Sequence, residues 1–162
     1  MKTTNSRAIG ATWYLEPITS YSVALNSVGV SSFYADFAVV VPEGLQAYVA
    51  NHVSPDGVIK LTQIAGVVPP RTPVLLRGEK FATHNLEVLN TQSQLDAANI
   101  FNGSYFADGN FAKGSVFTLS SFGGKPIMKK PAISRVGANE IYLVADSAWP
   151  DLSTYTFDFD DL

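Results

Sequence analysis

Cysteine is absent from the 162-residue chain, and histidine occurs only twice, at His52 and His84. The lack of cysteine excludes disulfide bonds, thiol catalysis and thiolate metal sites. Because the two histidines show no ligand-like spacing, neither a transition-metal site nor histidine-assisted nucleophilic catalysis is expected. No Gly-x-Ser-x-Gly turn and no glycine-rich phosphate loop followed by a helix is present. The sequence therefore predicts no catalytic residues, no metal and no cofactor.

Charge is also sparse and evenly spread. Only 15% of the residues are charged, and the formal net charge is −3. The basic residues are scattered, with Lys129-Lys130 as the only adjacent pair. Nucleic-acid-binding domains usually carry a basic stripe, so no nucleic-acid partner is expected.

Long apolar runs are missing as well. No stretch approaches the roughly 18 consecutive apolar residues of a membrane span, so membrane insertion is not expected. Residues 1–7 include a basic residue but no apolar run follows them, so the start does not resemble a signal peptide.

What the sequence does contain is a series of short alternating runs. Apolar and aromatic residues occupy every second position of residues 33–41, which predicts one strand. Residues 45–64 predict a β-hairpin, because two such runs flank the turn Ser54-Pro55-Asp56-Gly57. Further strand-like runs follow at residues 73–77, 84–89, 115–120, 139–145 and 154–159. One or two turns of helix are expected within residues 93–100.

This spacing predicts an all-β fold, specifically a β-sandwich of two antiparallel sheets with roughly eight to ten strands. We expect a flexible N-terminal segment over residues 1–12 and a single sandwich domain over residues 13–160. Residues 68–76 and 136–144 share a pattern of valine, polar turn and apolar strand. The repeat suggests pseudo-duplicated halves, as in a jelly roll, or two equivalent strands in facing sheets.

Exposed aromatic side chains are the candidate ligand-binding residues. Trp149 precedes Pro150, while Tyr105 and Phe106 lie close to the turn residues Asp108-Gly109-Asn110. Flat aromatic faces suit the CH groups of sugars, but large aromatic residues also fill or cap β-sheet cores. Trp13 and Tyr14, in a strand-like start, are expected to belong to the core.

The carboxylates give weaker signals. A glycosidase would need two of them facing each other across a cleft, and most acidic residues here lie in or beside turns. Asp36 lies within the predicted strand 33–41, and we expect its side chain to point to solvent from the outward face of a sheet. The aspartates near the C-terminus could supply calcium ligands, but Asp158 simply alternates with Phe157 and Phe159. Neither an enzyme nor a calcium site is expected.

Several segments resemble one family in order and spacing. They are residues 13–17, 33–37, 41–48, 61–64 and 68–78 in the first half, and residues 99–104, 114–119 and 138–143 in the second. Together they resemble an all-β accessory module found toward the C-terminus of large secreted proteins of gut and oral Bacteroidetes. The resemblance runs from about Trp13 to Phe159.

The resemblance implies a non-catalytic accessory or binding module, since such modules accompany glycosidases, proteases and adhesin-like proteins. It implies a secreted or cell-surface location, in which case the chain is a fragment that lacks its signal peptide and belongs to a larger chain or assembly. The expected ligand is a glycan or a protein. The alternative is a structural or assembly module, such as a component of a surface fibre or a phage virion.

Overall fold

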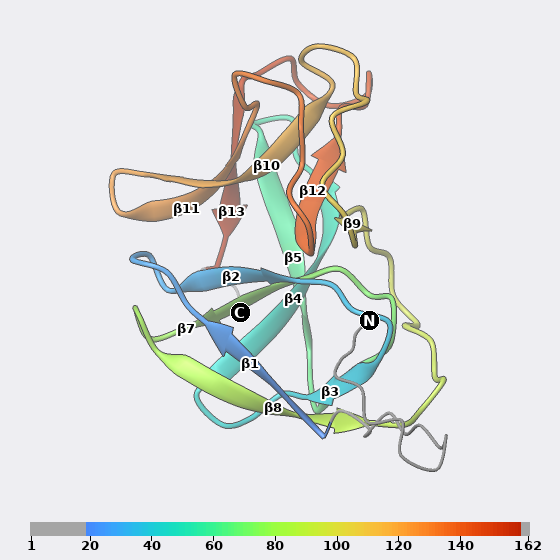
Figure 1. Cartoon of the computed structure of the whole chain (residues 1–162). Helices are drawn as coiled ribbons and strands as arrows, with labels where there is room; N and C mark the ends of the chain where they lie inside the picture. The colour runs from blue at the N-terminus through green and yellow to red at the C-terminus, as the bar shows by residue number, and fades with distance from the viewer. Residues whose placement is uncertain (1–18, 160–162) are drawn as a thin grey trace, which may run out of the picture.

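The computed structural model describes residues 19–159, which form thirteen β-strands and no helix (Figure 1). The predicted all-β class is therefore confirmed. The expected flexible segment, residues 1–12, and the expected core residues Trp13 and Tyr14 lie outside the described residues.

The strands form two sheets. The larger has the order β2 (Val30–Phe33), β7 (Val74–Gly78), β4 (Leu45–Val53), β5 (Val58–Ile64), β13 (Thr154–Asp158), β11 (Lys125–Lys129), β10 (Val116–Phe122), β12 (Glu140–Val144) and β9 (Asn102–Ser104). The smaller has the order β1 (Ser20–Ala24), β8 (Thr83–Leu89), β3 (Ala38–Val40) and β6 (Val67–Val68).

The nine-stranded sheet curls until its ends meet, which makes it nearly a barrel. Strand β12, near one end of the order, contacts β2 at the other end. The ring of Tyr34, just after β2, lies on Gly103 of β9, where an added Cβ would be only 2.2 Å from the ring. Side chains such as Tyr48, Phe117 and Leu143 fill the interior. Side-chain packing, rather than a hydrogen-bonded ladder, thus brings the two ends together.

The four-stranded sheet covers one part of this curled sheet. A second apolar cluster lies between them, with Val23 and Leu86 from the small sheet and Leu45 from the large one. Because side chains alternate along a strand, β7 serves both clusters: Leu75 enters the barrel interior and Leu76 the second cluster. Strand β4 is divided in the same way, so both strands are apolar on both faces.

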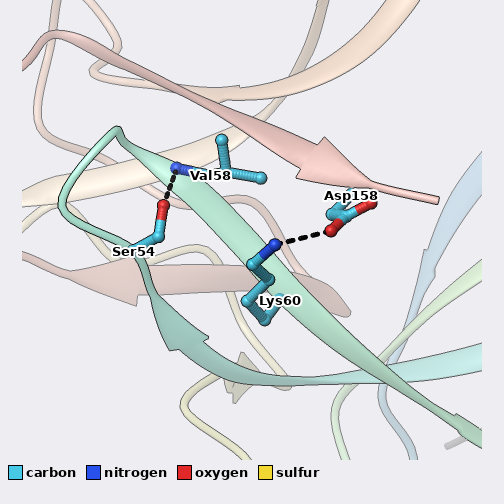
Figure 2. Close-up of polar contacts among 4 residues, drawn as sticks. All are labelled: Ser54, Val58, Lys60 and Asp158. Carbon is cyan, nitrogen blue, oxygen red and sulfur yellow. Dashed lines mark hydrogen bonds and ion pairs between the residues drawn. The ribbon is translucent and has the colours of Figure 1, made fainter. Parts of the chain in front are cut away.

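The last strand is inserted into the middle of the large sheet. Strand β13 pairs antiparallel with β11 but parallel with β5. The expectation that all pairs would be antiparallel is wrong here, because β13 arrives from a distant part of the chain rather than through a hairpin. Lys60 and Asp158, opposite each other in this pair, form an ion pair with 2.7 Å between Nζ and Oδ2 (Figure 2).

The hairpin predicted over residues 45–64 is confirmed as β4 and β5. The hydroxyl oxygen of Ser54 accepts a hydrogen bond from the backbone N–H of Val58 at 3.1 Å, which closes the turn (Figure 2). Gly57 has a φ of 79°, a conformation that glycine adopts at little cost.

The single strand predicted over residues 33–41 is wrong. The chain leaves the large sheet after Phe33 and joins the small sheet at Ala38, and Asp36 lies exposed in the bend between them. The carbonyl of Ala35 accepts a hydrogen bond from the N–H of Arg71 at 2.7 Å. Alternation persists across the bend because the chain passes along one core, where Phe33 and Val39 both pack.

The short helix expected within residues 93–100 is also absent. The end of this segment is instead bound to neighbouring strands through Asn99. The side-chain oxygen of Asn99 accepts hydrogen bonds from the N–H groups of Ala50 and Phe101, and its amide donates to the carbonyl of Pro73 at 2.9 Å. These long-range bonds fix an extended segment across β4 and the start of β7.

The repeated pattern falls on β7 and β12, which belong to the same nine-stranded sheet rather than to facing sheets. Within residues 19–159, no helix is long and apolar enough to cross a bilayer.

Candidate functional site

Two surfaces of the large sheet carry features suited to binding. The first, here called the aromatic surface, comprises Tyr34, Tyr105 and Phe106. The rings of Tyr34 and Tyr105 lie with centroids 4.6 Å apart, inclined at 34°. Tyr105 is 38% exposed and Phe106 is 80% exposed, so both predicted residues present ring area to solvent. The structure thus brings Tyr105 and Phe106 together and adds Tyr34, which sequence reasoning missed.

The backbone around Tyr105 is fixed from two sides. Strand β9 pairs with β12, and the N–H of Asn139 donates to the carbonyl of Ser104 at 2.6 Å. The hydroxyl of Ser104 donates to the carbonyl of Phe106. The two aromatic residues therefore project from a short turn that is tied to the sheet.

Polar groups accompany these rings. Burial raises the pKa of Tyr105 to about 12, and hydrogen bonding and charge interaction with Tyr34, then the carboxylate of Asp36, act in the same direction. Burial, followed by the carboxylate of Asp108, also raises the pKa of Tyr142. The hydroxyl of Tyr105 donates its proton to Tyr34 and keeps its oxygen as an acceptor, whereas the protonated hydroxyl of Tyr142 can donate to a polar ligand.

The third candidate, Trp149, lies apart from this group. It is half-buried at the edge of the barrel interior, and its ring meets the ring of Tyr155 edge-on at 6.0 Å. The hydroxyl of Tyr155 donates to the carbonyl of Pro150 at 2.6 Å, which holds the same loop. This packing gives Trp149 a structural role, and its part in binding stays a prediction.

The second surface is a groove of about 910 Å³, here called the cationic groove. One wall is the β10–β11 hairpin with Lys125 and Lys129, and the other contains Val28, Arg77 and Lys80 from β7 and the neighbouring loops. Strand β13 contributes Thr154, Thr156 and Phe157, and Phe159 directly follows this strand. In Figure 1 the hairpin and these loops extend to the left of the molecule.

The groove gathers positive charge. It collects four of the eleven basic residues of the chain, although the net charge of the chain is −3. Among residues 19–159 no acidic residue lines it and none of the four cations forms an ion pair. Within residues 19–159, the acidic residue that lies between Phe157 and Phe159 in sequence is Asp158, and it is paired with Lys60 outside the lining (Figure 2).

Aromatic rings lie among these charges. The guanidinium of Arg77 stacks over the ring of Phe159 at 3.9 Å, which orients its N–H donors. Phe159 is supported by Phe157, with ring centroids 5.7 Å apart. On the opposite wall, Phe122 at the end of β10 is 79% exposed. The groove therefore offers cations, hydroxyls and apolar ring faces together.

Sequence reasoning missed this groove. Its residues come from around β7, from the β10–β11 hairpin and from β13, and only the strand order β13-β11-β10 and the curl of the sheet bring them together. In the sequence the same cations appear scattered, which is why a basic surface was not predicted.

The two surfaces lie at opposite ends of β2. Val28, in the groove, precedes this strand, and Tyr34, on the aromatic surface, follows it. The four-residue strand between them spans about 13 Å. The aromatic surface and the cationic groove are thus separate sites that share no residue.

The histidines occupy different environments. His52 is exposed, and its Nδ1 lies 3.1 Å from the side-chain oxygen of Asn51. His84 is half-buried, and its Nε2 is buried without a hydrogen-bond partner among residues 19–159. In that range no group of three or more histidine or acidic side chains is placed to hold a metal ion.

The chain matches none of the protein-family models, curated proteins or solved structures with which it was compared.

Proposed function

We propose that the chain is a non-catalytic binding module of a secreted or cell-surface bacterial protein, and that its aromatic surface binds a glycan. The observation that supports this most directly is the placement of Tyr105 and Phe106, which expose ring faces on a turn tied to β9 and β12. Sugars present CH groups to such faces and hydroxyls to neighbouring polar groups.

The polar surroundings support the same proposal. The protonated hydroxyl of Tyr142 can donate to a sugar oxygen, and the hydroxyl oxygen of Tyr105 and the nearby carboxylates of Asp36 and Asp108 can accept from sugar hydroxyls. Phe106 makes no large contribution to the core, since four fifths of its side chain is exposed. A large exposed aromatic residue of this kind is more readily explained by contact with a ligand than by folding.

The proposal includes the sandwich expected from the sequence. We interpret the four-stranded sheet and the part of the large sheet that it covers as that sandwich, supported by the apolar cluster between them.

A glycan array followed by titration calorimetry on the bound sugar tests the proposal. Phe106→Ala is expected to lower affinity about tenfold or more, a loss of roughly 1.4 kcal/mol. Its thermal midpoint should stay close to that of the original chain, because an exposed side chain contributes little to stability. Phe81→Ala, a change at a ring that is 73% exposed and belongs to neither surface, is the matched control.

Loss of binding in the control as large as in Phe106→Ala would contradict the assignment to this surface. A chain that binds no sugar and forms concentration-dependent oligomers in light scattering would favour the alternative, an assembly module of a surface fibre or virion.

A further inference from the structure

We infer that the cationic groove is a second binding site, and that its ligand is an acidic polysaccharide whose sugar rings carry carboxylate or sulfate groups. This inference stands apart from the proposed function, because the groove and the aromatic surface share no residue.

The charge of the groove calls for an anionic ligand. Arg77, Lys80, Lys125 and Lys129 line it without an acidic residue between them, and none is neutralised by an ion pair within residues 19–159. Like charges held together raise the local potential and attract anions even when the whole protein is negative. Since the walls come from separate segments, the fold itself assembles this concentration of charge.

Its shape and other side chains point to a chain of sugars. The groove holds about 910 Å³ and is open, so a polymer can lie along it. Phe122, which is 79% exposed, provides a ring face for the CH groups of a sugar ring, while Thr154 and Thr156 provide hydroxyls for hydrogen bonds to sugar hydroxyls. A small inorganic anion would leave these apolar and hydroxyl groups without a partner.

The arrangement of Arg77 gives the site a specific contact. Its guanidinium carbon lies over the ring of Phe159, 3.9 Å from the ring centroid, and its N–H groups can still donate to a carboxylate or a sulfate. Among the described residues this guanidinium makes no hydrogen bond to another side chain. Because its contact with Phe159 already restricts the Arg77 side chain, ligand binding costs less conformational entropy.

The density of charge favours a polysaccharide over a nucleic acid. Duplex DNA carries a charge about every 1.7 Å, and binding to it depends on neutralising many phosphates. The groove offers four cations on a molecule of net charge −3, whose overall field opposes a dense polyanion. A sugar chain with a charge on each ring, or on alternate rings, matches four separated cations better.

Titration calorimetry with four probes tests the inference: polygalacturonate, dextran sulfate, neutral dextran and an oligo(dT) strand. Binding is expected for one or both acidic polysaccharides, with polygalacturonate reporting carboxylate recognition and dextran sulfate reporting sulfate recognition. Affinity should fall as salt is raised, because the contacts are ionic and exposed. Neutral dextran and oligo(dT) should bind at least about tenfold more weakly.

Charge reversals locate the site. Lys125→Glu and Lys129→Glu should each lower the affinity for the acidic polysaccharide about tenfold, whereas Lys113→Glu makes the same charge change outside the groove and should lower it less than about twofold. Lys113, Lys125 and Lys129 are all exposed, so the three variants should fold alike, which circular dichroism checks. Phe106→Ala should leave binding of the acidic polysaccharide unchanged. This variant therefore distinguishes a failure of the inference about the groove from a failure of the proposed function of the aromatic surface.

Four outcomes would each overturn the inference: no binding of either acidic polysaccharide, equal binding of dextran, tighter binding of oligo(dT), or an equal loss in Lys113→Glu.

Discussion

Two residues close to the aromatic surface hold left-handed backbone angles, which are disfavoured for Arg71 and tolerated better by asparagine at position 139. Arg71 has a φ of 56° and Asn139 a φ of 60°, both in the left-handed region where residues other than glycine are uncommon. Each carries a bond that the surface depends on: Arg71 binds the carbonyl of Ala35 in the bend after β2, and Asn139 binds Ser104. Strained backbone of this kind persists where surrounding contacts enforce it, and it is frequent at functional sites.

The pKa of Tyr105 predicts how stability depends on alkaline pH. A tyrosine ordinarily ionises near pH 10, but in the folded chain Tyr105 does so at about 12. The folded state therefore favours the neutral form. Its contribution to stability is complete below pH 10 and is lost as the pH rises through 12.

Chemical denaturation at several pH values measures this effect. Tyr105→Phe, which cannot ionise, is expected to lose less stability between pH 10 and pH 12 than the original chain does. Tyr21→Phe is the control at a tyrosine on β1, away from this surface. Identical pH profiles for Tyr105→Phe and the original chain would contradict the assigned pKa.

Single residues were predictable from the sequence where their environment is local. Tyr105 and Phe106 were expected to be exposed because turn residues follow them, and both are. Trp149 also adjoins a proline, but its packing depends on Tyr155, which lies in the next strand. The groove cations were not predictable as a group, because no local pattern encodes that the end of β7 and the β10–β11 hairpin line the same groove.

Among the elements, β9 shows how closely one strand can depend on a single glycine. The ring of Tyr34 occupies the space where a side chain at position 103 would begin. Gly103→Ala should therefore push Tyr34 aside and lower the free energy of unfolding by about 1–3 kcal/mol, the usual effect of overpacking. Thermal and denaturant unfolding measure the loss.

A double-mutant cycle identifies the cause. In a Tyr34→Ala background the clash is gone, so Gly103→Ala should then cost much less. Gly109→Ala, whose new Cβ would meet only an atom of Arg135 at 3.9 Å, is the control and should be nearly neutral. Equal losses at position 103 in both backgrounds would show that Tyr34 is not the reason for the glycine.

Among the elements, the alternation of apolar and polar residues predicted strands well where a strand stays within one sheet, as in the hairpin of β4 and β5. It failed for residues 33–41, because a chain that changes sheets along one core keeps its alternating pattern through the bend. It failed for residues 93–100 for a different reason. There the side chain of Asn99 forms hydrogen bonds with residues as distant in sequence as Ala50. Local helix propensity does not account for such long-range bonds.

At the scale of the whole molecule, the two apolar clusters are joined through β4 and β7. Leu75 and Leu76 are adjacent and fully buried, yet they enter different clusters. Replacing either by alanine should cost about 2–5 kcal/mol. Because the shared strands couple the clusters, we expect each variant to unfold in one transition, as a single domain would.

Two probes test this expectation. In a Trp13→Phe background, fluorescence of Trp149 reports the barrel interior, and far-ultraviolet circular dichroism reports all strands. Leu76→Ala changes only the other cluster, but it should shift both signals to the same new midpoint. Separate midpoints would show that the clusters unfold independently.

The parallel pairing of β13 with β5 has a consequence for synthesis of the chain. Thr156 is opposite Val58, and the intervening residues must all be made before these two partners can meet. Until then β5 and β11 each present an open edge to other proteins. During translation the curled sheet can be completed only after its last strand has left the ribosome, so a stalled or shortened product lacking β13 should be prone to aggregate.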